Sequence, residues 1–164
     1  MNPKLFDLSG RVIVITGAAG LLGQQHANAV ASVGGIPVLL DLRAGPIEKL
    51  ASKLNTQYGV PAQGYVVDIT RESEIETNKS ELLKRFGKID ALVNNAANNP
   101  KVEKKEGVNF SRLENFTLDM WRDDIAVGLT GAFLCAKYYG TAISKNPKGG
   151  VILNISSDLG LISP

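Results

Sequence analysis

Five short apolar runs recur along the chain, each of a length typical of a β-strand. They are RVIVIT at 11–16, IPVLLD at 36–41, GYVVDIT at 64–70, IDALVNN at 89–95 and GVILNIS at 150–156. The first run shows no alternation of apolar and polar residues, which is typical of a strand covered on both faces of a parallel sheet. The pattern therefore predicts five strands, and the last run is predicted to be buried like the first.

Helical periodicity fills the intervals between these runs. Thr70 is placed to cap the N-terminus of one of the helices, because its hydroxyl can accept from a free backbone N–H. Helices are predicted over 21–34, over 46–58, after Thr70, and over 117–139. The apolar side chains expected to point inward are Leu22, Ala29, Val30 and Val33 in the first helix, Leu50 and Leu54 in the second, and Ile75, Leu82, Leu83 and Phe86 in the third.

The alternation of strands and helices is repeated four times, which predicts an α/β fold with a doubly wound parallel sheet. Right-handed crossovers would place helices on both faces of that sheet. No internal repeat or linker divides the chain, so we expect a single domain over 1–164.

Residues 97–116 form a polar interval that contains Pro100 and Gly107 and predicts a loop longer than most strand-to-helix connections. Its cations would suit a substrate that carries a phosphate or a carboxylate, and a solvated surface loop is the alternative. These cations are Lys101, Lys104, Lys105 and Arg112.

The amino-acid composition argues against several classes of function. The net charge of +2 is too small, and the basic residues too scattered among acids, to indicate a nucleic-acid partner. Cys135 and His26 are the only residues of their types, which excludes a cysteine-based zinc cluster and a histidine-rich metal site. No apolar run approaches the roughly 20 residues that a membrane helix needs, and the N-terminus is polar. We therefore expect no metal, no membrane and a cytoplasmic location.

Three glycines follow the first strand in TGAAGLLG at 16–23. The first permits a tight turn, the second lets a pyrophosphate approach the backbone, and the third lets the helix pack close to the strand. Free N–H groups at the helix start would then hold the phosphate charge. Glycine also ends strands for purely structural reasons, but its position between a strand and a helix favours a dinucleotide site formed by Gly17, Gly20, Leu21, Leu22 and Gly23.

Two aspartates follow the next two strands. Asp41 ends the second strand, where an acidic residue commonly binds the ribose hydroxyls and repels a 2′-phosphate, so NAD is favoured over NADP. Arg43 keeps NADP as an alternative. Asp68, with the Ile69 backbone beside it, is placed to accept from the adenine amino group. A simple strand-end residue is the alternative for Asp41, and a capping or loop acid is the alternative for Asp68.

Together, LSGRVIVITGAAGLLG at 8–23, Asp41, VVDIT at 66–70, LVNNAA at 92–97 and GGVILNISS at 149–157 resemble the short-chain dehydrogenase/reductase family. The resemblance implies a Rossmann-type fold, NAD(H) or NADP(H) as cofactor, and hydride transfer between nicotinamide and an alcohol or carbonyl substrate. By position, Asn95 and Ala96 would line the cofactor ribose and Asn94 would brace its strand. Ser157 would donate a hydrogen bond to the substrate oxygen.

The chain departs from the family pattern at three positions. Its glycine spacing is commoner in the extended branch, whose members often act on nucleotide sugars, and Ala97 replaces a glycine. Gly128 stands where the family has a catalytic asparagine whose backbone carbonyl holds a water next to the catalytic lysine. We expect the carbonyl of Gly128 to retain that role.

The family's Tyr-x-x-x-Lys motif is missing from the chain, because no tyrosine has a lysine four residues later. Tyr138 and Tyr139 are expected to pack within a helix. The resemblance therefore implies the N-terminal part of a longer dehydrogenase, with a sheet incomplete at its C-terminal side and no catalysis without the missing residues. The full-length form would be a dimer or tetramer acting on a small molecule such as a sugar or sugar nucleotide. The alternatives are a non-catalytic dinucleotide-binding module and a fragment that neither binds nor folds.

Overall fold

The fold is built on one parallel sheet. The computed structural model describes residues 6–98 and 112–157. The strands pair in the order β3-β2-β1-β4-β5, and each pairing is parallel. This is the strand order of a Rossmann-type sheet, so the predicted α/β class is confirmed. The strands are β1 (Val12–Thr16), β2 (Ile36–Asp41), β3 (Gln63–Val66), β4 (Ala91–Asn94) and β5 (Val151–Asn154).

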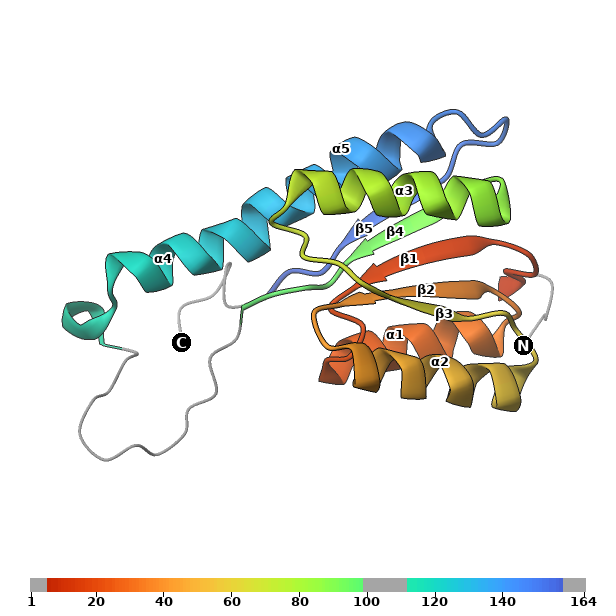
Figure 1. The fold of residues 1–164 in the computed structure, drawn as a ribbon, viewed down its shortest axis with the longest axis horizontal. Helices are drawn as coiled ribbons and strands as arrows, with labels where there is room; N and C mark the ends of the chain where they lie inside the picture. Colours follow the sequence, from red (N-terminus) through yellow and green to blue (C-terminus); the bar gives the residue numbers. More distant parts are fainter. Residues whose placement is uncertain (1–5, 99–111, 158–164) are drawn as a thin grey trace.

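Helices cover both faces of the sheet, as the crossover rule predicts. Helices α1 (Leu21–Ser32) and α2 (Ala44–Tyr58) lie on one face, and α3 (Glu72–Phe86) and α5 (Ala132–Ile143) lie on the other (Figure 1). Helix α4 (Leu118–Ile125) precedes α5 and extends beyond the sheet (Figure 1).

The sheet separates two apolar cores, because successive side chains of a strand point to opposite faces. In β1, Val12 and Val14 pack with the core under α3 and α5, whereas Ile13 and Ile15 pack with the core under α1 and α2. The first core contains Ile75, Leu82 and Tyr139. The second contains Ile47, Leu50 and Leu54. The packing expected for Tyr139 is thus confirmed.

The inner face of α1 differs from the prediction. Gly23, Ala27 and Ala31 are buried, while Leu22 is 55% exposed and Ala29 is also exposed. Close approach of α1 to the glycine turn rotates the smallest residues inward, since a Cβ on Gly23 would lie 2.3 Å from the carbonyl oxygen of Gly17. The apolar spacing alone predicted the wrong face.

The third strand is shorter than predicted and Thr70 is not a helix cap. Strand β3 ends at Val66, and Asp68 Oδ1 accepts from the backbone N–H of Thr70 at 2.9 Å and from its hydroxyl at 2.7 Å. Asp68 therefore forms a local turn that takes the chain out of the sheet. Helix α3 begins at Glu72, and Arg71 occupies its cap position without a side-chain hydrogen bond.

The helix predicted over 117–139 is divided into three parts. Thr117 caps α4, because its hydroxyl accepts from the N–H of Met120 at 3.2 Å. A π-helical turn then spans Ala126–Gly131 before α5, which continues to Ile143. Two glycines lie in this turn, and glycine lowers the cost of leaving regular α-helical geometry.

Residues 97–116 also contain regular structure, since Leu113–Asn115 form a 3-10 helix. The three lysines of the predicted loop, with Pro100 and Gly107, lie outside the described residues.

Strand β5 is exposed, which corrects the prediction of a buried strand. Its four residues are all exposed, with Val151 at 62%. The strand lies at the edge of the sheet and pairs only with β4 in the described part of the chain. The apolar residues of this strand predicted that other elements cover it. Whether a strand is covered depends on the elements that pack beside it, which the strand's own residues do not specify.

A buried carboxylate joins the beginnings of β1 and β4. Asp90 is 6% exposed and accepts from the backbone N–H of Val12 at 2.9 Å. Its oxygens also lie 2.7 Å from Arg11 Nη1 and 2.9 Å from Lys88 Nζ. Burial raises the pKa of Asp90, but the Val12 N–H and the two cations outweigh burial and hold this pKa below its ordinary value.

Asp90→Asn should lower the free energy of unfolding by about 2 kcal/mol at pH 7, because hydrogen bonds to a charged group are lost. A depressed folded-state pKa means that the carboxylate stabilises the fold fully above the unfolded pKa of about 4 and loses this effect as pH falls through the folded pKa. The difference between variant and parent should therefore shrink below pH 4. This difference in the free energy of unfolding is measured by urea unfolding, monitored by circular dichroism. The exposed Asp119→Asn variant is the control. A difference that stays constant with pH would contradict this role.

Candidate functional site

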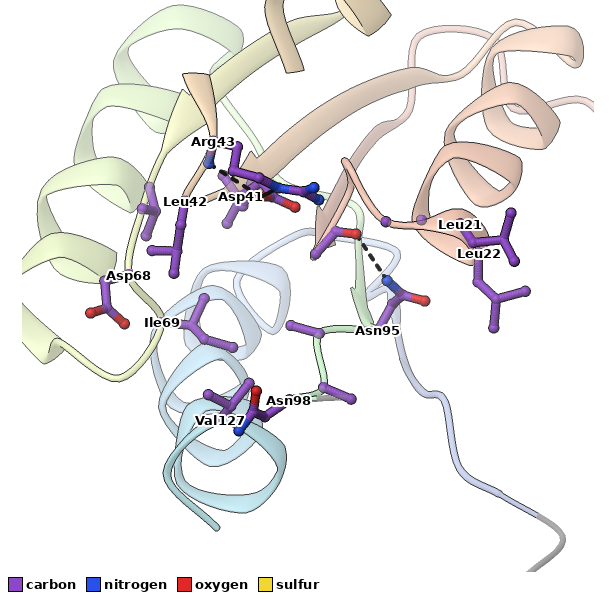
Figure 2. A pocket seen from close by; sticks show the side chains of 17 residues that line it. Leu21, Leu22, Asp41, Leu42, Arg43, Asp68, Ile69, Asn95, Asn98 and Val127 are labelled. Carbon is purple, nitrogen blue, oxygen red and sulfur yellow. Dashed lines mark hydrogen bonds and ion pairs between the residues drawn. The ribbon is translucent and has the colours of Figure 1, made fainter. Parts of the chain in front are cut away.

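A cavity of about 510 Å³ lies at the carboxyl ends of the central strands. It borders β1 and β4, where the chain order of the sheet reverses and where ligands of such folds bind. Figure 2 shows side chains from separate segments around it, among them Asp41, Asp68 and Asn95. All ten residues that the sequence predicted for a cofactor site line this one cavity: Gly17, Gly20, Leu21, Leu22, Gly23, Asp41, Asp68, Ile69, Asn95 and Ala96.

The glycine turn forms one wall of the cavity and requires two of its glycines on steric grounds. Gly17 has a φ of 63°, and a Cβ there would lie 2.9 Å from Ala96 Cα. A Cβ on Gly23 would clash with the backbone of Gly17 and Ala18. At Gly20 the added Cβ would lie 3.2 Å from the Gly17 oxygen, a tight but less severe contact.

Helix α1 presents an uncapped N-terminus to the cavity. Its cap residue Gly20 has no side chain to bond the first-turn N–H groups, and the first turn contains no acidic residue. These N–H groups and the helix dipole favour an anion. The arrangement matches what a pyrophosphate requires.

Asp41 fastens the end of β2 to the glycine turn. Its Oδ2 accepts from the N–H of Ala19 at 3.0 Å. Its Oδ1 accepts from the backbone N–H of Arg43 at 3.2 Å and from Arg43 Nε at 3.1 Å. The carboxylate is largely buried, at 10% exposure, while the Arg43 side chain is 59% exposed. Asp41 is thus a structural strand-end residue that also borders the cavity.

Thr16 and Asn95 fasten the end of β4 to the same turn. The hydroxyl of Thr16 accepts from the N–H groups of Asn95 and Ala96, each at 3.0 Å. The Asn95 side-chain amide donates to the carbonyls of Thr16 at 2.9 Å and Gly17 at 3.3 Å. Figure 2 shows Asn95 with one of these two hydrogen bonds. Sequence analysis missed Thr16, although its place at the end of β1, directly before the glycine turn, was the available signal.

Asp68 and Asn94 both have structural contacts. Asp68 has the local contacts of a loop acid, because its Oδ1 accepts from the backbone N–H and the hydroxyl of Thr70 in the turn before α3. Its contact with an adenine group stays a prediction. Asn94 braces its strand as expected, since its Nδ2 donates to Asn154 Oδ1 on β5 at 2.8 Å and to the Ala132 carbonyl at 3.3 Å.

The two predicted catalytic residues are not among those that line the cavity. Gly128 lies exposed in the π-helical turn, and its neighbour Val127 does line the cavity. A Cβ on Gly128 would have no atom of the described residues within 4 Å. Ser157 is exposed in the segment after β5. Their catalytic roles stay predictions.

The described chain contains one cysteine, and its environment disfavours a reactive thiolate. Cys135 is buried, and burial raises the pKa of its thiol to about 12, so the thiolate is scarce at neutral pH. Within residues 6–98 and 112–157, no group of three or more His, Cys, Asp or Glu residues could hold a metal ion. No helix in this same part of the chain is long and apolar enough to cross a membrane.

Comparison with known proteins identifies relatives over nearly the whole chain. A family model described as short chain dehydrogenase matches residues 11–164. D-threitol dehydrogenase of Mycolicibacterium smegmatis is 30% identical over 159 residues, which are 96% of this chain and 56% of that protein. An NADP-dependent mannitol dehydrogenase of Alternaria alternata is 27% identical, over 93% of this chain and 55% of that protein.

The fold agrees with a solved structure. The crystal structure of NAD+-bound xylitol dehydrogenase superposes with a TM-score of 0.83 at 28% identity, over 96% of this chain and 56% of that one. The chain therefore spans little more than half the length of the relatives that it matches.

Proposed function

Because the chain belongs to the short-chain dehydrogenase family, we propose that its cavity binds a nicotinamide dinucleotide and that the whole protein transfers a hydride between this cofactor and an alcohol or carbonyl substrate. The observation that carries the proposal is the convergence of all ten predicted cofactor residues on one cavity beside the open N-terminus of α1. The pyrophosphate would lie against the glycine turn, where backbone N–H groups and the helix dipole favour negative charge.

We assign residues 1–164 to a single dinucleotide-binding domain. One sheet with an apolar core on each face supports this assignment. A binding module without catalysis is the second candidate, favoured by the observation that neither Gly128 nor Ser157 lines the cavity. Turnover by the whole protein distinguishes the two, since the module would bind cofactor without oxidising or reducing any substrate.

A polyhydroxylated alcohol or the corresponding carbonyl compound is our proposed substrate class. The relatives named for threitol, mannitol and xylitol support this class. A panel of polyols assayed for cofactor reduction tests it, and activity confined to apolar alcohols would contradict it. We retain a cytoplasmic location as a prediction, supported by the single buried cysteine.

Self-association of the whole protein is also proposed. Large apolar side chains are exposed along α4, the π-helical turn and α5, and such a surface is typical of an interface. They are Leu118, Trp121, Leu129 and Phe133, with exposures of 55% to 63%. A sedimenting species of monomer mass at micromolar concentration would contradict this proposal.

Gly23→Ala should abolish detectable NADH binding, because the added Cβ would lie 2.3 Å from the Gly17 carbonyl oxygen and force the turn open. Gly45→Ala is the matched control, since a Cβ there meets nothing within 4 Å and the residue lies in α2. Fluorescence titration with NADH measures binding, and circular dichroism checks that both variants fold. A folded Gly23→Ala protein that binds NADH like the parent would refute the assigned site.

We propose NAD as the preferred cofactor, with NADP as the alternative. The carboxylate of Asp41 places negative charge where a 2′-phosphate would lie, and its bond to Arg43 Nε draws that cation toward the carboxylate. One relative is named as NADP-dependent and one solved structure as NAD+-bound, so the family alone does not decide between the cofactors. We infer that Asp41 and Arg43 decide between them in this chain.

Asp41→Asn should raise the affinity for NADPH by about tenfold and change that for NADH far less, because like-charge repulsion is removed. The asparagine oxygen can still accept from the Ala19 N–H that Asp41 binds. Glu48→Gln, an exposed change on α2, removes the same charge away from the cavity and serves as control. Equal gains for NADPH in both variants would attribute the effect to net charge and contradict discrimination by Asp41.

In the whole protein we assign the substrate hydrogen bond to Ser157 and a backbone role to the Gly128 carbonyl. Gly128→Asn should then leave kcat within a few-fold of the parent, because the carbonyl is retained and the site has room for a side chain. Ser157→Ala provides the loss-of-activity reference in the same steady-state assay. A many-fold gain in kcat for Gly128→Asn, without such a gain for Gly128→Ala, would show that the asparagine amide contributes to catalysis. That result would contradict a role of the backbone carbonyl alone.

A further inference from the structure

A second cavity, of about 410 Å³, lies between the C-terminal halves of α3 and α5. Within residues 6–98 and 112–157, it shares no lining residue with the first cavity. Its described lining includes four lysines and no aspartate or glutamate: Lys79, Lys88, Lys137 and Lys145. A cavity with this lining attracts anions.

Two of these lysines approach one aromatic ring. Lys79 Nζ lies 5.2 Å from the ring centroid of Tyr138, and Lys137 Nζ lies 5.1 Å from it. Glu72 Oε1 compensates only Lys137, at 2.6 Å, and also accepts from the Tyr138 hydroxyl at 2.8 Å. Lys79 and Lys145 take part in no ion pair among the described residues. Among the described residues, the site therefore contains more positive charge than its acidic neighbours compensate.

Stabilisation of helix ends explains only part of this charge. Cations are favourable at helix C-termini, and Lys145 comes immediately after Ser144, the C-cap residue of α5. Lys88 follows α3 and pairs with the buried Asp90. Lys79, by contrast, lies in the middle of α3, and Lys137 in the middle of α5, where the dipole does not favour them.

The remaining walls suit an organic group. Leu83 and Ala142 contribute apolar surface beside the Tyr138 ring. The volume lies within the range of small-molecule sites, roughly 300–1,000 Å³. A nucleic-acid strand would need an extended basic surface, and the chain carries a net charge of only +2.

We propose that this cavity binds a phosphorylated small molecule, with the phosphate between Lys79 and Lys145 and the organic part against Tyr138 and Leu83. Lysine ammonium groups bind phosphate as point charges and need no planar geometry. Such a ligand would neutralise the two cations that form no ion pair within the described residues. The site and the proposed cofactor cavity have no described lining residue in common.

The test uses TROSY spectra of the ¹⁵N-labelled intact protein, titrated separately with inorganic phosphate and with phenyl phosphate. Saturable shifts are expected at the amides of Gly87, Lys88, Lys145 and Asn146, with tighter binding of phenyl phosphate because its ring adds apolar contact. Amides of the glycine turn report binding at the first cavity in the same spectra. Shifts confined to that turn, or equal affinity for the two probes, would overturn the proposal.

The double variant Lys79→Gln with Lys145→Gln should weaken phenyl phosphate binding at the second cavity at least tenfold. Lys49→Gln with Lys53→Gln removes the same charge from exposed positions of α2 and should change it less than twofold. Spectral dispersion shows whether each variant folds, and the two single lysine variants replace the double variant if it does not. Equal weakening by both pairs would reduce the effect to net charge and refute a built site.

Discussion

Hydrogen bonds between strand ends and the glycine turn determine the shape of the cavity at the carboxyl ends of the central strands. A glycine-rich segment loses more conformational entropy on folding than other sequences, so it needs specific contacts to hold one conformation. Asp41 supplies such a contact from β2 through the N–H of Ala19. Asn95 supplies another from β4 through the carbonyls of Thr16 and Gly17. The turn is thereby fixed on both sides, and the first turn of α1 is left facing the cavity.

These contacts change how the candidate site residues should be understood. For Asp41 and Asn95, a structural role and a binding role are not alternatives, because the same side chains hold the turn and border the cavity. A substitution that removes either side chain would alter the shape and the charge of the site together. Only a change that preserves the hydrogen-bond acceptor while removing the charge separates the two effects at Asp41.

Sequence reasoning located the elements and the cavity lining well, because both follow from local patterns. Apolar runs specify buried parallel strands, and residues that follow such strands meet at one edge. The errors lie where tertiary contacts override local pattern. Leu22 is exposed because Gly23 must approach Gly17, and Thr70 is held in a turn by Asp68 and does not cap α3. The exposure of β5 depends on what lies beside it, which no run of residues encodes.

Helix α3 connects the surroundings of the two cavities. At its start, Glu74 accepts from the N–H of Asp68, which lines the first cavity, while Glu72 accepts from Lys137 and Tyr138, which line the second. Loss of Lys137 would therefore leave Glu72 without its cation and disturb the segment that carries Asp68. Weaker ligand binding in such a variant would have two explanations: the lost charge of Lys137 in the second cavity, or the disturbed segment that carries Asp68. Lys79 and Lys145 have no ion-pair partner in the described chain, so their removal changes the charge of the second cavity while these contacts at the start of α3 remain.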